Sequence, residues 1–483
     1  MKALRALYSN DKTQTIDHLA AKALAIDSFQ LMKLAGEAVY QHLQSYKNLL
    51  VVTGPGNNGG DGFVIAELAR QAQQKVTVLC LSDPKSLKGD ALLAAQQYQG
   101  DCVYEWPQCA CDCVVDAIFG TGLNQAVTGE YAASINRINQ LQTHVLSVDI
   151  PSGLNGTTGQ IEGVAVKATQ TISILAANTG LFTLDGKDCC GEIVFEKLGV
   201  QPEVYDAVPQ TAQLSDASLL ASIKASRCNN SHKGQFGHVL TVGGQAGMMG
   251  AVLLAAQAVL KSGAGLTTVV TDPKHADLLP LYAPELMTQG FDELEQHQLV
   301  SPLSTRPADV LLIGMGLGQS QWSKQLFKKS VQSNIPLVID ADGLTLLAGA
   351  VVVPRTLKVI TPHPKEAATL LNTSLNCIQS DRWLAVKRLA QKYQCVAVLK
   401  GSGTLISDGI NCFCCPYGNA NLATAGAGDV LAGLVAGLLA QGFDALSAAH
   451  LAVVWHAIVG ENNPYGLTMT ATNLLNTLQL VVK

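Results

Sequence analysis

The sequence predicts two successive α/β domains, each built on a largely parallel sheet with helices on both faces. Short β-branched runs alternate with helix-like stretches along the chain, and this alternation restarts once near the middle. With 483 residues the chain is too long for one ordinary core, and 48% hydrophobic residues leave ample material for two. We expect one domain over residues 1–211 and a second over 212–483.

The first block contains five strand-like runs separated by stretches of helical periodicity. The first run enters a glycine-rich loop, and a helix is expected behind that loop at residues 63–70. Parallel strands joined by crossover helices produce this order. Strands are therefore expected at residues 49–53, 76–80, 113–116, 145–148 and 172–175.

The second block begins at the run 238–242, and a long alanine-rich helix is expected at residues 251–261. The connecting segment 201–227 carries no strand signal, and Ser215 or Asp216 is a suitable helix N-cap there. Further strands are expected at residues 266–270, 310–313, 337–339, 359–361 and 396–399.

Charge and hydropathy exclude several classes of partner. The formal net charge of −5 gives no electrostatic basis for binding nucleic acid or a membrane surface. The N-terminus lacks the apolar region and cleavage site of a secretory signal. Apolar stretches such as 430–440 are interrupted by glycine and are too short to span a bilayer. We therefore expect a cytoplasmic protein.

The thirteen cysteines fall in tight groups, for example Cys109, Cys111 and Cys113. Structural zinc sites use C-x-x-C pairs at two separated places, and the sequence does not have this pattern. Disulfides are rare in reducing compartments. We expect thiols that pack as small hydrophobic groups.

The densest glycine loop covers residues 54–62, between the first strand and the following helix. Exposed amides and the helix dipole at such a junction suit an anion such as pyrophosphate. Asn57, Asn58 and Asp61 add polar groups to the loop. A tight turn without a ligand is the alternative, but five glycines with two asparagines favour a ligand site.

Two carboxylates, Asp116 and Asp149, follow predicted strands of the first block. Ligands of open parallel sheets gather at the carboxyl ends of the strands. A single aspartate in such a place is more often a cap for the next turn. Two of them beside a glycine loop favour a common site.

Residues 57–61, 116–123 and 148–153, in this order, resemble the NAD(P)H-hydrate epimerase family, whose domain is Rossmann-like. Residues 31–38 resemble the start of that family, whereas 177–181 lack its usual Lys-Pro before the glycine. The resemblance implies a potassium ion on Asn58, Asp116 and Ser152, and such oxygen ligands suit a hard cation. The substrate contacts it implies are Asn57, Asn58, Gly59, Gly60, Asp61, Gly120, Thr121, Gly122, Leu123, Asn124, Gln125, Ala126 and Asp149.

Asp149 is the candidate acid or base of this domain. The hydrate carries a hydroxyl on C6 of the reduced nicotinamide, beside the ring nitrogen. The lone pair of that nitrogen assists either ring opening or loss of hydroxide. A carboxylate that carries one proton back and forth is sufficient for C6 to invert.

The clearest signal of the second block is the small-residue run 421–433, which leads into an apolar helix. The amides of residues 425–428 can point together at the helix N-terminus, as an anion hole for a transferring phosphoryl group. Asp429 lies in the first turn, where it can accept a proton from a nucleophilic hydroxyl. An acidic residue favourable to the helix dipole is the alternative, at about 0.5 kcal/mol.

Two further turns belong to this block. Residues 400–404 end a strand in a compact glycine turn that suits nucleotide phosphates, although a simple hairpin is the alternative. His363 stands between two prolines directly after another strand. The sequence has no GxxxxGK[ST] element, which disfavours a P-loop kinase.

The second block resembles the ribokinase-like superfamily, most closely its ADP-dependent NAD(P)H-hydrate dehydratase branch. Met315 departs from a usual proline and Lys365 from a common glycine. The segments that carry the resemblance are 232–237, 243–251, 314–318, 361–366 and 426–429. By this resemblance Ala251, Gly316, His363 and Asp429 contact the hydrate, and the nucleotide contacts are Lys400, Gly401, Ser402, Gly403, Thr404 and Gly428.

The two resemblances together imply a bifunctional repair enzyme for NADHX and NADPHX. The first domain would interconvert the R and S epimers. In the second, Asp429 would deprotonate the C6 hydroxyl, ADP would supply its β-phosphoryl, and phosphate would then leave, giving NAD(P)H and AMP. The magnesium ion that we expect there would neutralise the transferring charge. We also expect a homo-oligomer.

Two other functions compete with this one. A small-molecule kinase for a pyrimidine or vitamin shares the Gly-Ala-Gly-Asp turn at 426–429, but the segment 361–366 and the fused first domain argue against it. A non-catalytic scaffold shares the fold of the first domain. The presence of Asn58, Asp116, Asp149 and Ser152 argues against an inactive site.

Overall fold

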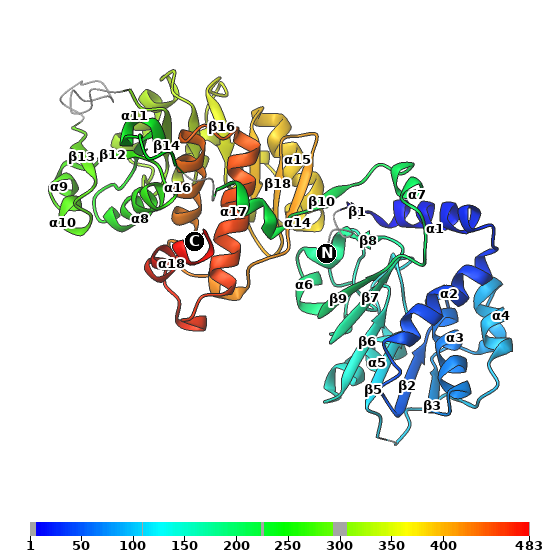
Figure 1. The fold of residues 1–483 in the computed structure, drawn as a ribbon. Helices are drawn as coiled ribbons and strands as arrows, with labels where there is room; N and C mark the ends of the chain where they lie inside the picture. Colours follow the sequence, from blue (N-terminus) through cyan, green and yellow to red (C-terminus); the bar gives the residue numbers. More distant parts are fainter. Residues whose placement is uncertain (1–5, 109, 224–226, 293–306, 483) are drawn as a thin grey trace. The chain divides into compact units, whose positions relative to one another are not determined.

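The computed structural model describes residues 6–108, 110–223, 227–292 and 307–482 (Figure 1). Contacts between α-carbons divide the chain into two compact units, Met1–Leu214 and Ser215–Lys483. Unit 1 includes strand β10 (Ala212–Leu214) because this strand pairs antiparallel with β1 (Ala6–Tyr8). The expectation that 201–227 contains no strand is therefore wrong. A three-residue strand is too short to produce a periodic pattern.

Unit 1 is built on a seven-stranded sheet of order β4-β3-β2-β5-β6-β7-β9, in which all neighbouring strands are parallel. All five expected strands are present. The two additional strands, β4 and β9, lie at the edges of the sheet. Their residues are mostly only half-buried, so they lack the continuous apolar run of a central strand. The strands are β2 (Asn48–Thr53), β3 (Lys75–Cys80), β4 (Cys102–Val103), β5 (Cys113–Ala117), β6 (His144–Val148), β7 (Gln170–Ile174) and β9 (Glu192–Glu196); β8 (Ala177–Asn178) pairs with β1.

Both faces of this sheet are covered by helices. Successive strand residues point to opposite faces, so Val51 packs in one hydrophobic cluster with α2, α3 and α4, while Leu50 and Val52 pack in another with α5. The helices are α1 (Asn10–Leu24), α2 (Ser28–Gln41), α3 (Asn57–Gln71), α4 (Gly89–Gln97), α5 (Gly129–Gln140), α6 (Gly186–Cys189) and α7 (Pro202–Asp206).

Helix α3 begins earlier than the expected residues 63–70, since Gly56 is its N-cap and Asn57 its first residue. Three glycines of the predicted loop therefore lie inside the helix. A Cβ at Gly59 would meet Gly54 O at 2.2 Å, and a Cβ at Gly62 would meet the Ala117 side chain at 2.7 Å. These glycines let the first turns of α3 lie directly against the sheet.

Unit 2 is built on strands in the order β13-β12-β11-β14-β15-β16-β17-β18-β19, parallel as far as β17 and antiparallel beyond it. All six expected strands are present, and β13, β18 and β19 are additional. The strands are β11 (His238–Val242), β12 (Leu266–Thr271), β13 (Met287–Gly290), β14 (Val310–Ile313), β15 (Leu337–Ile339), β16 (Leu357–Ile360), β17 (Val396–Leu399), β18 (Thr404–Ser407) and β19 (Cys412–Cys415).

A large hydrophobic cluster packs α8, α16 and α17 against this sheet. Asp216 is the N-cap of the short helix after the unit boundary, and its side chain accepts from Ser218 N. The helices of eight or more residues are α8 (Met249–Lys261), α11 (Gln321–Val331), α13 (Pro364–Leu371), α15 (Arg382–Tyr393), α16 (Ala427–Ala440) and α17 (Ala445–Glu461). The shorter ones are α9 (Pro273–Ala276), α10 (Leu279–Tyr282), α12 (Asp342–Ala348), α14 (Leu375–Ser380), α18 (Ala471–Thr477) and α19 (Gln479–Val482).

The described residues also bear on membrane insertion, disulfide formation and metal binding. No helix within the described ranges combines the length and apolar character that crossing a membrane requires. No disulfide joins any of the twelve described cysteines, and Cys109 lies outside the described residues. Nor do three or more His, Cys, Asp or Glu side chains of the described chain form a metal-holding group.

Candidate functional site

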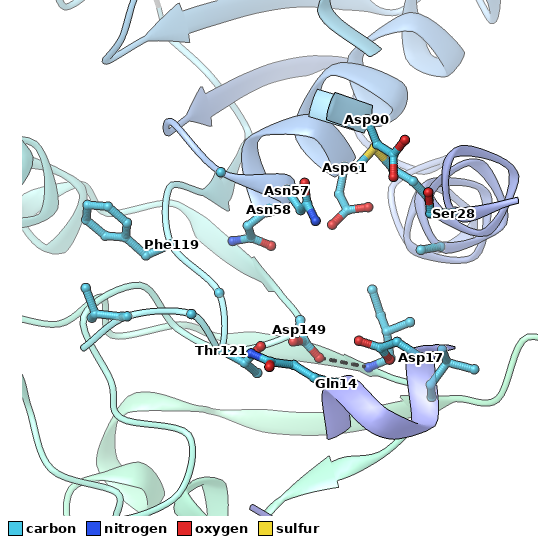
Figure 2. A pocket seen from close by; sticks show the side chains of 18 of the residues that line it. Gln14, Asp17, Ser28, Asn57, Asn58, Asp61, Asp90, Phe119, Thr121 and Asp149 are labelled. Atoms are coloured by element: carbon cyan, nitrogen blue, oxygen red, sulfur yellow. Dashed lines mark hydrogen bonds between the residues drawn. The ribbon is translucent and has the colours of Figure 1, made fainter. Parts of the chain in front are cut away.

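Unit 1 has a pocket of about 600 Å³ at the carboxyl ends of β2, β5 and β6 (Figure 2). One part of its wall is formed by the start of α3, the loop after β5 and Asp149 after β6. Residues of α1 and α2 form another part. It is lined by Gln14, Asp17, Ser28, Leu31, Met32, Ala35, Pro55, Gly56, Asn57, Asn58, Asp61, Asp90, Ile118, Phe119, Gly120, Thr121, Gly122, Leu123, Asn124, Gln125, Asp149, Ile174, Leu175 and Leu198.

Most residues expected to contact substrate line this pocket. The expected contacts that do so are Asn57, Asn58, Asp61, Asp149 and all six residues 120–125. Gly59, Gly60 and Ala126 are not among the lining residues. Gly60 instead allows close packing, because a Cβ there would meet the Met32 side chain at 2.8 Å. For these glycines the structure provides a packing role.

Asp149 occupies a left-handed backbone conformation, with φ of 64°, directly after β6. Its amide donates to Ile172 O at 2.8 Å, and its Oδ1 accepts from Ile174 N at 3.3 Å, the contact drawn in Figure 2. Burial raises the pKa of Asp149 to about 6. A carboxyl with such a pKa can both hold and release a proton near neutral pH.

Two other carboxyl groups share this environment. Burial, followed by the charges of Asp149 and Asp17, raises the pKa of Asp61 well above its ordinary value. Burial and the charge of Asp149 raise the pKa of Asp17 to about 7. Sequence reasoning missed Asp17 because it lies on α1, which has no glycine turn or strand-end signal.

The three residues expected to hold potassium surround the start of the loop after β5. Asp116 is fully buried, and Ser152 donates to it from Oγ at 2.5 Å and from its amide at 2.9 Å. Ser147 Oγ adds a third donor at 2.8 Å. Ser152 Oγ also accepts from Phe119 N, whereas the buried amide nitrogen of Asn58 has no hydrogen-bond partner among the described residues.

These oxygen-bearing side chains could hold a hard cation. Burial raises the pKa of Asp116 although the hydrogen bonds from Ser152 and Ser147 oppose the shift. A nearby cation would lower that pKa and stabilise the carboxylate. The amide of Asn58 could present its oxygen to such an ion if its two ends are exchanged by rotation about the side chain.

In unit 2, Asp429 lies in the first turn of α16, as expected. Gly426 precedes that helix with φ of 87° and is its N-cap, so the turn brings the first amides of the helix together. Burial, and next the charge of Asp340, raise the pKa of Asp429 to about 7, while Lys400 opposes them. Asp429 can therefore act as a base near neutral pH.

Lys400 is the central cation of this site. Its Nζ lies 2.8 Å from Asp340 Oδ1 and 3.9 Å from Glu366 Oε2. A Cβ at Gly428 would lie 3.4 Å from Lys400 Nζ, so the start of α16 faces this lysine. Burial disfavours the charge of Lys400, but Asp340 and Glu366 raise its pKa above the ordinary value.

Residues 400–404 form the turn of a hairpin, since β17 and β18 are antiparallel. The alternative interpretation of residues 400–404, a simple hairpin turn, is therefore correct for the backbone of this segment. Buried Arg382 holds the turn: its Nη2 donates to the carbonyls of Leu399, Lys400 and Gly403 at 3.4, 3.4 and 3.3 Å. A Cβ at Gly401 would meet Arg382 Nη1 at 2.7 Å.

His363 is the N-cap of α13. Its Nδ1 accepts from the amides of Lys365 and Glu366 at 3.1 and 3.3 Å, and its Nε2 lies 3.2 Å from Glu366 Oε1. Through Glu366 it adjoins Lys400. The hydrogen bond from His363 and the charge of Lys400 outweigh burial and hold the pKa of Glu366 below its ordinary value.

The remaining expected contacts are neighbours of each other. A Cβ at Gly316 would lie 3.2 Å from that of Ala251, and Gly318 N donates to Asp342 at 2.8 Å. Asp342 in turn raises the pKa of Asp429, so this loop adjoins the same site. Asp340 was missed, although it follows β15 as Asp149 follows β6. The strand-end rule applied to the first block would have identified it.

Comparisons with known proteins identify a matching family for each of the two units. Residues 28–180 match the family described as YjeF-related protein N-terminus, and residues 239–480 match the family described as NAD(P)H-hydrate dehydratase. The chain is 38% identical over 468 residues to the bifunctional NAD(P)H-hydrate repair enzyme Nnr of Coxiella burnetii, covering 95% of each chain. The Escherichia coli enzyme of the same name is 37% identical over 96% of this chain and 91% of its own.

Among solved structures, a ribokinase-like superfamily protein from Enterococcus faecalis V583 is 30% identical with a TM-score of 0.51. It covers 57% of this chain, and 96% of its own length is matched. The expected ribokinase-like fold of the second domain is confirmed. Identity above 30% over nearly the full length of several relatives, together with two family matches in the expected order, decides the assignment. The chain belongs to the family of bifunctional NAD(P)H-hydrate repair enzymes.

Proposed function

We propose that unit 1 interconverts the R and S epimers of NADHX and NADPHX, and that unit 2 dehydrates the S epimer with ADP as co-substrate. The observation that carries the proposal is the occurrence of one poised carboxyl in each unit. The pKa of Asp149 is raised to about 6 and that of Asp429 to about 7, each at the expected end of a strand or start of a helix. Each can take and return a proton near neutral pH.

In unit 1, Asp149 is the proposed acid and base. Asn57, Asp61 and residues 120–125 are proposed to hold the hydrate in the pocket, with C6 facing Asp149. Asn58, Asp116 and Ser152 are proposed to hold potassium, whose positive charge would offset the negative charge of the dinucleotide beside these carboxyls. The protein groups themselves carry the proton.

In unit 2, Asp429 is proposed to deprotonate the C6 hydroxyl as its oxygen attacks the β-phosphoryl of ADP. The amides at the start of α16 stabilise the charge on that phosphoryl group. Lys400 and the turn 401–404 hold the nucleotide, and Ala251, Gly316 and His363 hold the hydrate. The C6–O bond then breaks as the ring nitrogen donates its lone pair, and phosphate leaves. C5 then loses a proton to the departing phosphate or to water, which forms the C5–C6 double bond of NAD(P)H, and AMP remains.

A magnesium ion is proposed to accompany the nucleotide and to neutralise phosphate charge. Three carboxylates, Asp340, Asp342 and Glu366, raise the pKa of a fourth carboxyl, Asp429, and the charge of Lys400 opposes them. This excess of negative charge is consistent with a divalent cation in the occupied site. ADP rather than ATP is the proposed donor, and titration of both nucleotides against the same hydrate tests that choice.

Single variants in the full chain test the two assignments separately. Asp149→Ala is expected to abolish interconversion of the epimers and to leave dehydration of the S epimer intact. Equal epimerisation by Asp149→Ala and the unaltered enzyme would refute the role of Asp149. The competing kinase function is tested with hydroxymethylpyrimidine as acceptor, and turnover of that compound alone would refute the repair function.

Assembly and location complete the proposal. We propose a cytoplasmic homo-oligomer acting on small molecules. Sedimentation of the purified chain measures the assembly, and fractionation of cells measures the location. A monomer, or a protein recovered outside the cytoplasm, would contradict these two points without affecting the chemistry.

A further inference from the structure

The epimerase pocket offers an unusual choice of proton carriers. Among the described residues, its lining includes four carboxyl groups, Asp17, Asp61, Asp90 and Asp149, but no Lys, Arg, His, Cys or Tyr. Within this described lining, a side-chain acid or base with a pKa near neutral is therefore a carboxyl. One carboxylate is sufficient for inversion, but ring opening of a carbinolamine is assisted further when a second group donates a proton to the ring nitrogen while the first accepts the hydroxyl proton.

The carboxyls of the pocket differ in the side from which they enter it. In Figure 2, Asp17 and Asp149 enter from the same side of the pocket, whereas Asp61 enters from the side of α3. Asp17 and Asp149 are also close enough that the charge of Asp149 raises the pKa of Asp17. Asp17 lines the pocket, so a ligand held there can reach its carboxyl.

We propose that Asp17 is the second proton-transfer residue of the epimerase site and works as a pair with Asp149. The pair fits ring opening, because the ring nitrogen and the hydroxyl oxygen are bonded to the same carbon, C6. Two neighbouring carboxyls can reach those two atoms from one side. The inference rests on the proposed epimerase function and adds a second proton-transfer residue to it.

The proton balance closes without any further reagent. Asp149, as carboxylate, takes the hydroxyl proton while the C6–N1 bond breaks, and Asp17, as carboxylic acid, gives its proton to N1. The product is an aldehyde at C6 and a ring-opened N–H. After rotation about C5–C6, N1 attacks the other face of the aldehyde. Asp17 takes back the N–H proton and Asp149 returns its proton to the oxygen, so both residues regain their starting states.

The surrounding titratable groups are compatible with this division. The pKa of Asp149 is about 6 and that of Asp17 about 7, so near pH 6.5 the former is mainly ionised and the latter mainly protonated. Asp61 faces both, and burial followed by the charges of Asp149 and Asp17 raises its pKa well above the ordinary value. Tyr205 of α7 faces Asp17, and burial followed by charges that include Asp17 raises its pKa to about 12, so it stays neutral.

The test uses the full chain with racemic hydrate, ADP and magnesium, followed by the absorbance of reduced nicotinamide. The S epimer reacts in a first phase, and the R epimer follows in a second phase limited by epimerisation. Asp17→Asn is expected to slow the second phase by at least about 100-fold, or to the uncatalysed rate, and to leave the first unchanged. Asp11→Asn on the same helix is the control, since Asp11 is not a lining residue.

The pH profile separates proton transfer from a structural role. The second phase of the unaltered enzyme is expected to be bell-shaped, rising through about pH 6 as Asp149 ionises and falling above about pH 7 as Asp17 loses its proton. Asp17→Glu should keep both limbs, and Asp17→Asn should lose the alkaline one. An unaltered enzyme without an alkaline limb would overturn the proposal even if the Asn variant did not fold.

The outcomes also distinguish this inference from the function on which it rests. If the unaltered chain shows no enzyme-dependent second phase, the epimerase function itself is wrong. If the unaltered chain epimerises and Asp17→Asn does so equally well, only the role of Asp17 is wrong. A slower Asp17→Asn that keeps the bell-shaped profile would show a structural contribution and would also overturn proton transfer by Asp17.

Discussion

Asp429→Asn is expected to remove dehydratase activity and, at the same time, to stabilise unit 2. Burial and the charge of Asp340 raise the pKa of Asp429 from 3.8 to about 7. The folded chain thus disfavours the ionised carboxyl. A difference of one in pKa corresponds to about 1.4 kcal/mol, so ionised Asp429 costs at most about 4 kcal/mol. Asp429 is partly exposed, and solvent screening reduces this to about 2 kcal/mol.

The sign of the pH dependence follows from the raised pKa. Below pH 3.8 the carboxyl is neutral in both folded and unfolded chains, and it costs nothing. The cost grows between pH 3.8 and about 7 and is complete above that. Asp429→Asn should therefore raise the free energy of unfolding by about 1 kcal/mol at pH 5 and about 2 kcal/mol at pH 8.

Thermal unfolding at pH 5 and pH 8 measures this effect. For a unit of this size, about 2 kcal/mol corresponds to a rise of roughly 4–8 °C in Tm. Asp277→Asn is the matched control, because Asp277 is exposed and lies outside the site. A variant no more stable than the unaltered chain at pH 8, or equally stabilised at both pH values, would refute the electrostatic reasoning. Dehydration should fall by about 100-fold or more.

Three further variants test the neighbouring groups. Lys400→Met removes the cation that lowers the pKa of Asp429, so the acid limb of the dehydratase pH profile should move to higher pH. An unmoved limb would contradict the electrostatic effect of Lys400 on Asp429. Gly60→Ala should destabilise the chain by about 1–3 kcal/mol in urea unfolding. Gly122→Ala, which meets nothing within 4 Å, should not, and equal effects would contradict the packing. Arg382→Met should loosen the hairpin turn and raise the KM for ADP more than it lowers kcat, whereas an unchanged KM would contradict its positioning role.

The sequence was most informative where strands are buried in the middle of a parallel sheet. Such strands are continuous apolar runs, and every one expected in either unit is present. The edge strand β9 (Glu192–Glu196) was missed because its residues are only half-buried. The first turns of α3 were read as a loop, because three glycines there normally disfavour a helix, and their need for close packing is visible only in three dimensions.

The same distinction holds for the sites. Asp149 and Asp429 carry local signals, a strand end and a small-residue turn, so sequence alone located them. Asp17 reaches the pocket only through the placement of α1, which no local pattern encodes. Arg382 likewise contributes through contacts with a turn that is distant in sequence. The sequence could not identify site residues, such as Asp17 and Arg382, that tertiary packing brings to the site from distant segments.

The most direct test of a repair enzyme with two cooperating sites is the extent of conversion of racemic NADHX. With ADP, the unaltered full chain is expected to convert both epimers completely to NADH, measured by absorbance. Asp149→Asn should stop at half, apart from the slow uncatalysed epimerisation. Conversion of only half by the unaltered chain, or no conversion at all with either ADP or ATP, would contradict the proposed function.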